Sequence, residues 1–206
     1  MTIKAVIFDI GNVLLEWNPE RFYDAEIGPE RREALFAKVD LHAMNDRVDM
    51  GENFQQTVYE TADAHPDFRS EIRLWHDRWI EMASPAIDRS VQALRALKTN
   101  GVPVFALSNF GIQSFAFAQT KYDFLSEFDR SYISGHMGVT KPAPLIYQMV
   151  EKDCGLAPSS LFFTDDRVDN IAQADARGWQ THLFDGTDPF ITRLINAGLL
   201  KAGQVT

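Results

Sequence analysis

The chain has 206 residues, of which 45% are hydrophobic and 24% are charged. This length suits one domain, or a core that carries an inserted subdomain, and the apolar content excludes a largely disordered protein. The 29 acidic residues outnumber the 20 Lys and Arg residues, and the net charge of -9 disfavours a protein that binds the phosphate backbone of nucleic acids.

The first residues and the single cysteine bear on where the protein works. Residues 1–10 lack the features of a signal peptide, because their apolar run is short and ends on Asp9 without a cleavage site of small residues. No apolar stretch has the length of a membrane span, so we expect a cytoplasmic protein that does not bind membranes. Cys154 has no partner for an internal disulfide and is predicted to be a small buried apolar residue in a helix.

The predicted elements begin with a short buried strand. Residues 3–8 are apolar and β-branched, and the turn-forming segment 9–12 follows them, which is typical of a parallel strand. Residues 17–84 contain no strand signal, and their apolar residues recur at helical spacing. This segment is predicted to be a small helical bundle with Trp75 and Trp79 in its interior.

From Pro85 onward, predicted helices alternate with predicted strands. Such alternation implies a parallel sheet that is covered by helices on both faces. The sequence therefore predicts an α/β fold, with a Rossmann-like three-layer core formed by residues 1–15 and 85–206 and an inserted α-helical cap formed by residues 16–84. The predicted strands are 102–107, 132–133, 161–164 and 181–184, and the predicted helices are 87–100, 112–120, 144–154, 168–177 and a terminal helix that carries Phe190, Leu194 and Leu199.

Polar residues follow three of these strands. Asp9 comes after the first strand, Ser108 and Asn109 come after the strand 102–107, and Asp165 and Asp166 come after the strand 161–164. In open parallel sheets the ligand site lies at the carboxyl ends of the strands. We therefore expect these side chains to face one site.

Four segments of the chain combine polar and charged residues with the ends of predicted strands or with a Gly-x-x-Lys-Pro context. They are Phe8-Asp9-Ile10-Gly11-Asn12-Val13, Leu107-Ser108-Asn109, Gly138-Val139-Thr140-Lys141-Pro142 and Phe163-Thr164-Asp165-Asp166-Arg167-Val168-Asp169-Asn170. In this order they resemble the motifs of the haloacid-dehalogenase superfamily. The resemblance covers nearly the whole chain, and within the superfamily it points to small bacterial sugar-phosphate phosphatases and to the N-terminal phosphatase domain of soluble epoxide hydrolase.

The resemblance implies a phosphatase that acts on a small phosphorylated metabolite. Asp9 would be the nucleophile and would form an aspartyl-phosphate that water later hydrolyses. Ser108, Asn109 and Lys141 would bind the phosphate oxygens, and the Lys141 ammonium would also balance the charge of Asp9 and of the transferring phosphoryl group.

The resemblance also implies a bound Mg²⁺. Its ligands would be the Asp9 carboxylate, the backbone carbonyl of Gly11 and the Asp166 carboxylate, all of them hard oxygen donors. Asp165 and Asn170 would support these ligands without binding the ion.

Gly11 departs from the pattern of the phosphatases. They usually carry a second Asp at this position, which protonates the leaving group, and without it we expect a preference for sugar-1-phosphates and aryl phosphates, whose leaving groups are acidic. A water near Asn12 or the cap residue Glu16 are alternative proton donors.

Two other functions remain open from the sequence. One is a metal-independent 2-haloacid dehalogenase, since those enzymes also lack the second Asp, although they replace the acidic pair by small polar residues. The other is a non-catalytic regulatory protein of the same fold that binds phosphate.

Overall fold

The computed structural model describes residues 2–205 and has a parallel sheet of five strands at its centre. The strand order is β5-β4-β1-β6-β7, so the first strand of the chain lies in the middle of the sheet. The strands are β1 (Ala5–Phe8), β4 (Val104–Ser108), β5 (Arg130–Ile133), β6 (Leu161–Asp165) and β7 (Gln180–Leu183).

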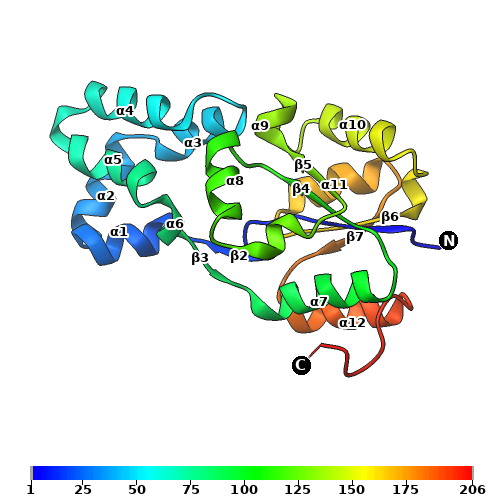
Figure 1. The fold of residues 1–206 in the computed structure, drawn as a ribbon. Coiled ribbons are helices and arrows are strands. Elements are labelled where there is room, and N and C mark those ends of the chain that lie inside the picture. The colour runs from blue at the N-terminus through cyan, green and yellow to red at the C-terminus, as the bar shows by residue number, and fades with distance from the viewer. Residues whose placement is uncertain (1, 206) are drawn as a thin grey trace.

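Helices cover both faces of the sheet, which confirms the predicted three-layer α/β core (Figure 1). Successive residues of a strand point to opposite faces. In β1, Val6 and Phe8 belong to the apolar cluster formed with α7 (Asp88–Thr99) and α12 (Thr187–Asn196), while Ala5 and Ile7 belong to the cluster formed with α10 (Pro144–Cys154) and α11 (Val168–Ala176). β1 is fully buried, which explains its unbroken apolar sequence.

Shorter elements connect these layers. They are α8 (Ile112–Gln119), α9 (Ser134–Met137) and two short 3₁₀ helices, η2 (Asp123–Ser126) and η3 (Pro158–Ser160). Two predictions in this region are wrong in detail. Leu199 lies beyond the end of α12, and Cys154 is only half-buried, because α10 ends there and Gly155 turns the chain in a left-handed conformation at the surface.

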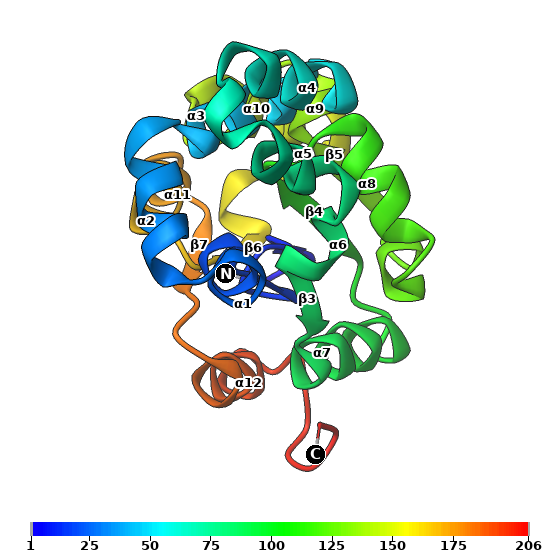
Figure 2. The same ribbon diagram turned by 90° about the vertical axis from the view of Figure 1, so that its left-hand side faces the viewer.

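The predicted helical segment forms a separate group of helices at one end of the sheet, called the cap below (Figures 1 and 2). Three of these helices have an N-cap side chain that accepts a hydrogen bond from a backbone N–H of the first turn. The N-cap residues are Asn18 for α1, Asp40 for α3 and Asn53 for α4. Trp75 and Trp79 are buried, as predicted. The helices are α1 (Pro19–Ile27), α2 (Pro29–Lys38), α3 (Leu41–Asp49), α4 (Phe54–Ala64), the 3₁₀ helix η1 (Pro66–Phe68), α5 (Arg69–Asp77) and α6 (Trp79–Met82).

A two-stranded antiparallel ribbon joins the cap to the core. It pairs β2 (Leu15–Trp17) with β3 (Ala83–Ala86). The prediction of an entirely helical segment up to Ser84 is therefore wrong at its two ends, because the two strands find hydrogen-bonding partners in each other. Backbone hydrogen bonds from Asn18 N to Met82 O, 2.9 Å, and from Ile87 N to Leu14 O, 2.8 Å, extend the ribbon on both sides.

None of the helices formed within residues 2–205 combines the length and the apolar character that crossing a membrane requires.

The cap contacts the core a second time, at the turn between α3 and α4. The Ser134 hydroxyl donates a 2.7 Å hydrogen bond to the backbone carbonyl of Asp49. A Cβ atom on Gly51 would lie 2.7 Å from the carbonyl oxygen of Gly135, and one on Gly111 would lie 2.5 Å from Cγ1 of Val48. Glycine is therefore needed where the cap and the core meet in this arrangement.

Gly51→Ala tests this contact, with Gly101→Ala as the matched control. Both glycines have positive φ angles, +106° and +76°, but a Cβ on Gly101 would meet no atom within 4 Å among the residues described. Both variants should lose stability from backbone strain. Gly51→Ala should lose about 1–3 kcal/mol more, because of its steric clash. Equal losses in urea denaturation would contradict a tight cap–core contact.

Candidate active site

The carboxyl ends of the central strands bring the predicted site residues together. Phe8 pairs with Ala106 of β4 and with Thr164 of β6, and the backbone N–H of Asp9 donates a 2.9 Å hydrogen bond to the carbonyl of Thr164. Asp9, Ser108 and Asp165 therefore sit at the same edge of the sheet. This edge and the cap enclose a cavity of about 460 Å³.

Most of the predicted site residues line this cavity. They are Asp9, Gly11, Ser108, Asn109, Lys141, Asp166 and Asn170. Asp165, which was predicted to support the metal ligands without binding the ion, is fully buried.

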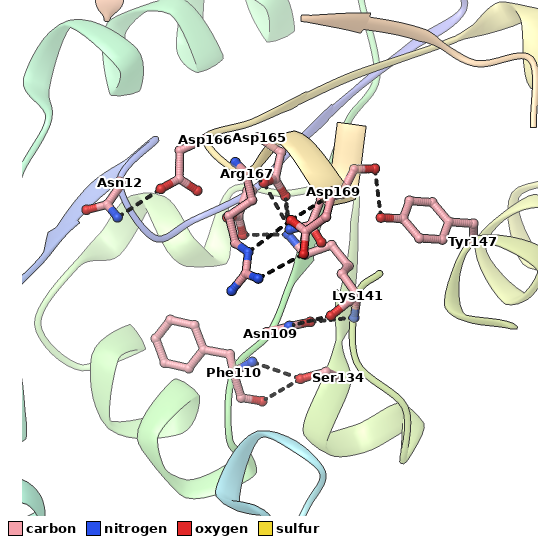
Figure 3. Close-up of polar contacts among 12 residues, drawn as sticks. Asn12, Asn109, Phe110, Ser134, Lys141, Tyr147, Asp165, Asp166, Arg167 and Asp169 are labelled. Carbon is pink, nitrogen blue, oxygen red and sulfur yellow. Dashed lines mark hydrogen bonds and ion pairs between the residues drawn. The ribbon is translucent and has the colours of Figure 1, made fainter. Parts of the chain in front are cut away.

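Lys141 is a buried ammonium held between two carboxylates. Its Nζ lies 2.9 Å from Oδ1 of Asp9 and 2.5 Å from Oδ2 of Asp165. Asn109 fixes the Lys141 backbone: its side-chain Nδ2 donates to the Lys141 carbonyl at 3.0 Å, and its Oδ1 accepts from the Lys141 N–H at 2.7 Å (Figure 3). Both polar atoms of the Asn109 side chain are therefore engaged with the Lys141 backbone, and phosphate binding by Asn109 stays a prediction.

The electrostatics of this cluster follow from burial. Burial raises the pKa of Asp9 to about 6, although the Lys141 charge and a hydrogen bond from Ser108 lower it and the charge of Asp165 raises it. Burial would lower the pKa of Lys141, but the charges of Asp9 and Asp165 outweigh it, and the pKa lies above its usual value. The lysine is thus a permanent cation beside the predicted nucleophile.

Asp165 and Asp166 differ in how their oxygens are used. Both oxygens of Asp165 accept hydrogen bonds: Oδ2 from Lys141, Oδ1 from the backbone N–H of Arg167 at 2.8 Å, and each from Nδ2 of Asn170 at 3.0 Å (Figure 3). Asp166 is half-buried, and its Oδ2 accepts a 3.0 Å hydrogen bond from Nδ2 of Asn12. Burial raises the pKa of Asp166.

These carboxylates form a cluster that suits a cation. Asp9, Asp165 and Asp166 each offer one oxygen, and these oxygens all lie within 4.8 Å of one another. Asn170 lines the cavity, and its buried Oδ1 accepts no hydrogen bond from residues 2–205, so it can accept one from a group bound in the cavity.

The cap contributes polar groups that the sequence analysis did not single out. His42, Asn45 and Asp49 line the same cavity as Asp9, from α3. Asn45 is fixed in place, because its Oδ1 accepts a 3.1 Å hydrogen bond from Nε1 of Trp75 while its Nδ2 donates to Oδ2 of Asp49 at 2.9 Å. These three residues match no sequence motif, so their place in the cavity wall could be recognised only from the folded cap.

The family model of the haloacid dehalogenase-like hydrolases matches residues 3–176. The chain belongs to this family. It is therefore an enzyme, a hydrolase.

Curated relatives of the chain include two phosphatases. It is 26% identical to a sesquiterpene phosphatase of Aspergillus oryzae over 183 residues, which cover 86% of this chain and 87% of that protein. It is 25% identical to a D-ribitol-5-phosphate phosphatase of Bacteroides thetaiotaomicron over 202 residues, with 87% and 90% covered. The match to drimenol cyclase of Aspergillus calidoustus, at 22% identity, covers 94% of this chain but 36% of that protein, so the chain spans about a third of its length.

Solved structures share the fold. A predicted HAD-like hydrolase from Porphyromonas gingivalis matches with a TM-score of 0.72 at 22% identity, covering 95% of this chain and 98% of that one. A family enzyme from Bacteroides thetaiotaomicron, in complex with magnesium and inorganic phosphate, matches with a TM-score of 0.58 at 24% identity, covering 87% and 93%.

Replacing Lys141 tests the electrostatics of the hydrolase site. Lys141→Met leaves Asp9 and Asp165 buried without their cation, which should lower the free energy of unfolding by about 3–5 kcal/mol at pH 8 in the presence of a chelator. The loss should shrink toward pH 5. Burial raises the pKa of Asp9 in the folded state, and without the Lys141 charge the largest effect that opposes this shift is lost. A group with a raised folded-state pKa stabilises the fold less as pH rises through that pKa.

Lys98→Met is the control, because Lys98 pairs with Asp129 at 3.0 Å near the surface. Such a pair contributes about 1 kcal/mol or less. Denaturant unfolding across this pH range measures both variants. A loss for Lys141→Met that matched the control, or that did not change with pH, would mean that the buried ion pair does not stabilise the fold.

Proposed function

We propose that this hydrolase is a magnesium-dependent phosphatase that hydrolyses a small phosphomonoester through an aspartyl-phosphate on Asp9. The observation that carries the proposal is the position of the Asp9 carboxylate. It follows the central strand, lines the cavity and lies 2.9 Å from the buried ammonium of Lys141. A buried carboxylate fixed at a strand end beside a cation is suited to attack a phosphoryl group, whose own negative charge must be balanced.

Charge balance supports a divalent cation. The cluster of Asp9, Asp165 and Asp166 carries three negative charges, and Lys141 contacts two of them with one positive charge. Asp166, the Asp9 carboxylate and the Gly11 carbonyl would hold the ion, because Asp165 already accepts hydrogen bonds at both oxygens. When bound, magnesium supplies electrostatic stabilisation of the phosphoryl oxygens.

In the proposed reaction an oxygen of Asp9 attacks the phosphorus, and the bond to the ester oxygen breaks. The Lys141 ammonium, the Ser108 hydroxyl and the backbone N–H of Asn109 bind the phosphoryl oxygens. Water then attacks the phosphorus of the aspartyl-phosphate, which releases inorganic phosphate and restores the Asp9 carboxylate. The cap limits the access of bulk water to the cavity.

The residues on the cap side of the cavity favour a substrate that carries hydroxyl groups. Asn45 and Asp49 offer hydrogen-bonding atoms to the cavity, and Trp17 and Trp79 offer apolar surface of the kind that packs on sugar rings. We therefore favour a sugar or polyol phosphate over a long apolar chain such as a terpenyl phosphate. The preference for sugar-1-phosphates over sugar-6-phosphates stays a prediction for a site in which no other residue replaces the acid missing at Gly11, tested by comparing the two glucose phosphates.

Asp9→Asn tests the covalent mechanism. The amide is a poor nucleophile and nearly the same size, so phosphatase activity should fall by at least about 10⁴-fold, the scale on which the loss of a catalytic nucleophile acts. Asp123→Asn is the control, because that side chain is 86% exposed and lies outside the cavity lining. Residual activity of Asp9→Asn near that of the control would exclude Asp9 as the nucleophile. Halide release from 2-haloacids by an enzyme inactive on phosphoesters would instead favour the dehalogenase.

A pair of variants tests the metal site. Asp166→Ala should weaken Mg²⁺ binding measured by calorimetry more than Asp165→Ala, because Asp165 is saturated with protein hydrogen bonds. Unfolding curves in chelator accompany the titrations, since Asp165→Ala removes one of the two carboxylates that contact Lys141 and the acceptors of the Asn170 Nδ2 hydrogen bonds. The reverse order of affinities, among variants that remain folded, would assign the ion to Asp165.

A further inference from the structure

The turn at the end of α3 carries an acid that faces the reaction site. Asp49 is the last residue of α3 and lines the same cavity as Asp9. Its carboxyl accepts hydrogen bonds from Nδ2 of Asn45, at 2.9 Å, and from the backbone N–H of Gly111. Asn45 belongs to the cap and Gly111 to the core, so the position of this carboxyl is fixed by both parts of the molecule.

The contacts around Asp49 hold its backbone as well. Its carbonyl accepts a hydrogen bond from Ser134, whose Oγ in turn accepts one from the N–H of Phe110 at 2.8 Å (Figure 3 shows the Phe110–Ser134 pair). Gly111 and Gly51 allow the close approach that these bonds require. The carboxyl therefore reaches this position only when the cap is seated on the core.

The surroundings of Asp49 favour its protonated form. Burial raises the pKa of Asp49 to about 7, the charges of Asp46 and Asp9 raise it as well, and the Gly111 N–H and Lys141 lower it. The carboxyl also lies at the C-terminus of α3, where the helix dipole disfavours an anion. An acid of this kind holds a proton near neutral pH and gives it up readily, as a general acid must.

Three other titratable residues on the cavity wall are less suited to this task. Glu16, one of the donors considered from the sequence, is about half exposed and forms an ion pair with Arg21. His42 is exposed and lies 3.4 Å from Glu20. Asp166 is engaged by Asn12 and belongs to the carboxylate cluster.

We propose that Asp49, supplied by the cap, is the proton donor for the leaving oxygen, in place of the acid that Gly11 cannot provide. This inference rests on the proposed phosphatase function. As Asp9 bonds to phosphorus, the electron pair of the breaking P–O bond stays on the alcohol oxygen, which takes the proton of Asp49. The Asp49 carboxylate then takes a proton from the water that attacks the aspartyl-phosphate, so the alcohol, phosphate and the original protonation state are recovered.

The test compares two leaving groups in Asp49→Asn. For glucose 6-phosphate, whose leaving alcohol is a poor acid, kcat/KM should fall by about 10²–10⁴-fold, the usual contribution of a general acid. For p-nitrophenyl phosphate, whose leaving phenolate needs no proton, kcat/KM should fall by less than about tenfold. This parameter ends at the first irreversible step, so hydrolysis of the aspartyl-phosphate does not enter it.

Two further variants control for charge and for folding. Asp46→Asn removes a second carboxylate that also lines the cavity from α3, and the ratio of the two kcat/KM values should stay that of the wild type if Asp49 alone donates the proton. Asp49→Glu keeps a carboxyl and should restore part of the activity on glucose 6-phosphate. It also keeps the test decisive if Asp49→Asn does not fold: a glucose 6-phosphate activity in Asp49→Glu no higher than in Asp49→Ala would overturn the proposal.

The outcomes separate this inference from the function on which it rests. Equal losses on both substrates in a folded Asp49→Asn would overturn the proton donor while leaving the phosphatase intact. A wild-type enzyme without activity on any phosphoester, p-nitrophenyl phosphate included, would overturn both.

Discussion

A lysine ammonium buried between two carboxylates is the interaction on which this site depends. The side chain of Lys141 is 1% exposed, and that of Asp165 is fully buried. Removing such charges from water costs several kcal/mol for each ion, so they are tolerated only where the partners meet in good geometry. The parallel register of β1 and β6 places Asp9 and Asp165 side by side, and Asn109 holds the Lys141 backbone against them. The order of the sheet thus sets the electrostatics of the cavity.

The cavity is divided between two parts of the chain with different chemistry. The sheet edge supplies the charged groups that suit a phosphoryl group and a cation. The cap supplies His42, Asn45 and Asp49, whose positions depend on the contact of the α3–α4 turn with the core. In the proposed mechanism the nucleophile is therefore permanently in place, while the proton donor is in place only when the cap is seated. This arrangement would couple the chemical step to the closure of the cap.

Much of the core could be predicted from the sequence, because its signals are local. An apolar strand followed by a polar turn identifies β1, β4 and β6, and the rule that ligands bind at strand ends then brings Asp9, Ser108 and Asp165 to one edge. The predicted strand limits differ from the observed ones by one or two residues, since local patterns do not define where pairing stops. Trp75 and Trp79 were recognisable as buried from helical spacing alone.

The features that escaped prediction depend on contacts between distant residues. β2 and β3 are short, and each forms a strand only because it pairs with the other, although the whole cap sequence separates them. The side chain of Asn109 binds the backbone of Lys141, which is 32 positions away, so its structural role has no local signal. Asp49 belongs to no motif, and its environment exists only once α3 has docked on Gly111 and Ser134.

The central claim is that the Asp9 carboxylate bonds covalently to phosphorus, and trapping that intermediate tests it most directly. The enzyme would be mixed with magnesium and a phosphomonoester that carries a radiolabelled phosphoryl group, quenched with acid within the first turnover, and digested for peptide mapping. The account predicts label on the peptide that contains Asp9, in a bond that hydroxylamine cleaves, as expected for an acyl phosphate. Label on another residue, or full turnover with no label on the protein at any quench time, would contradict it.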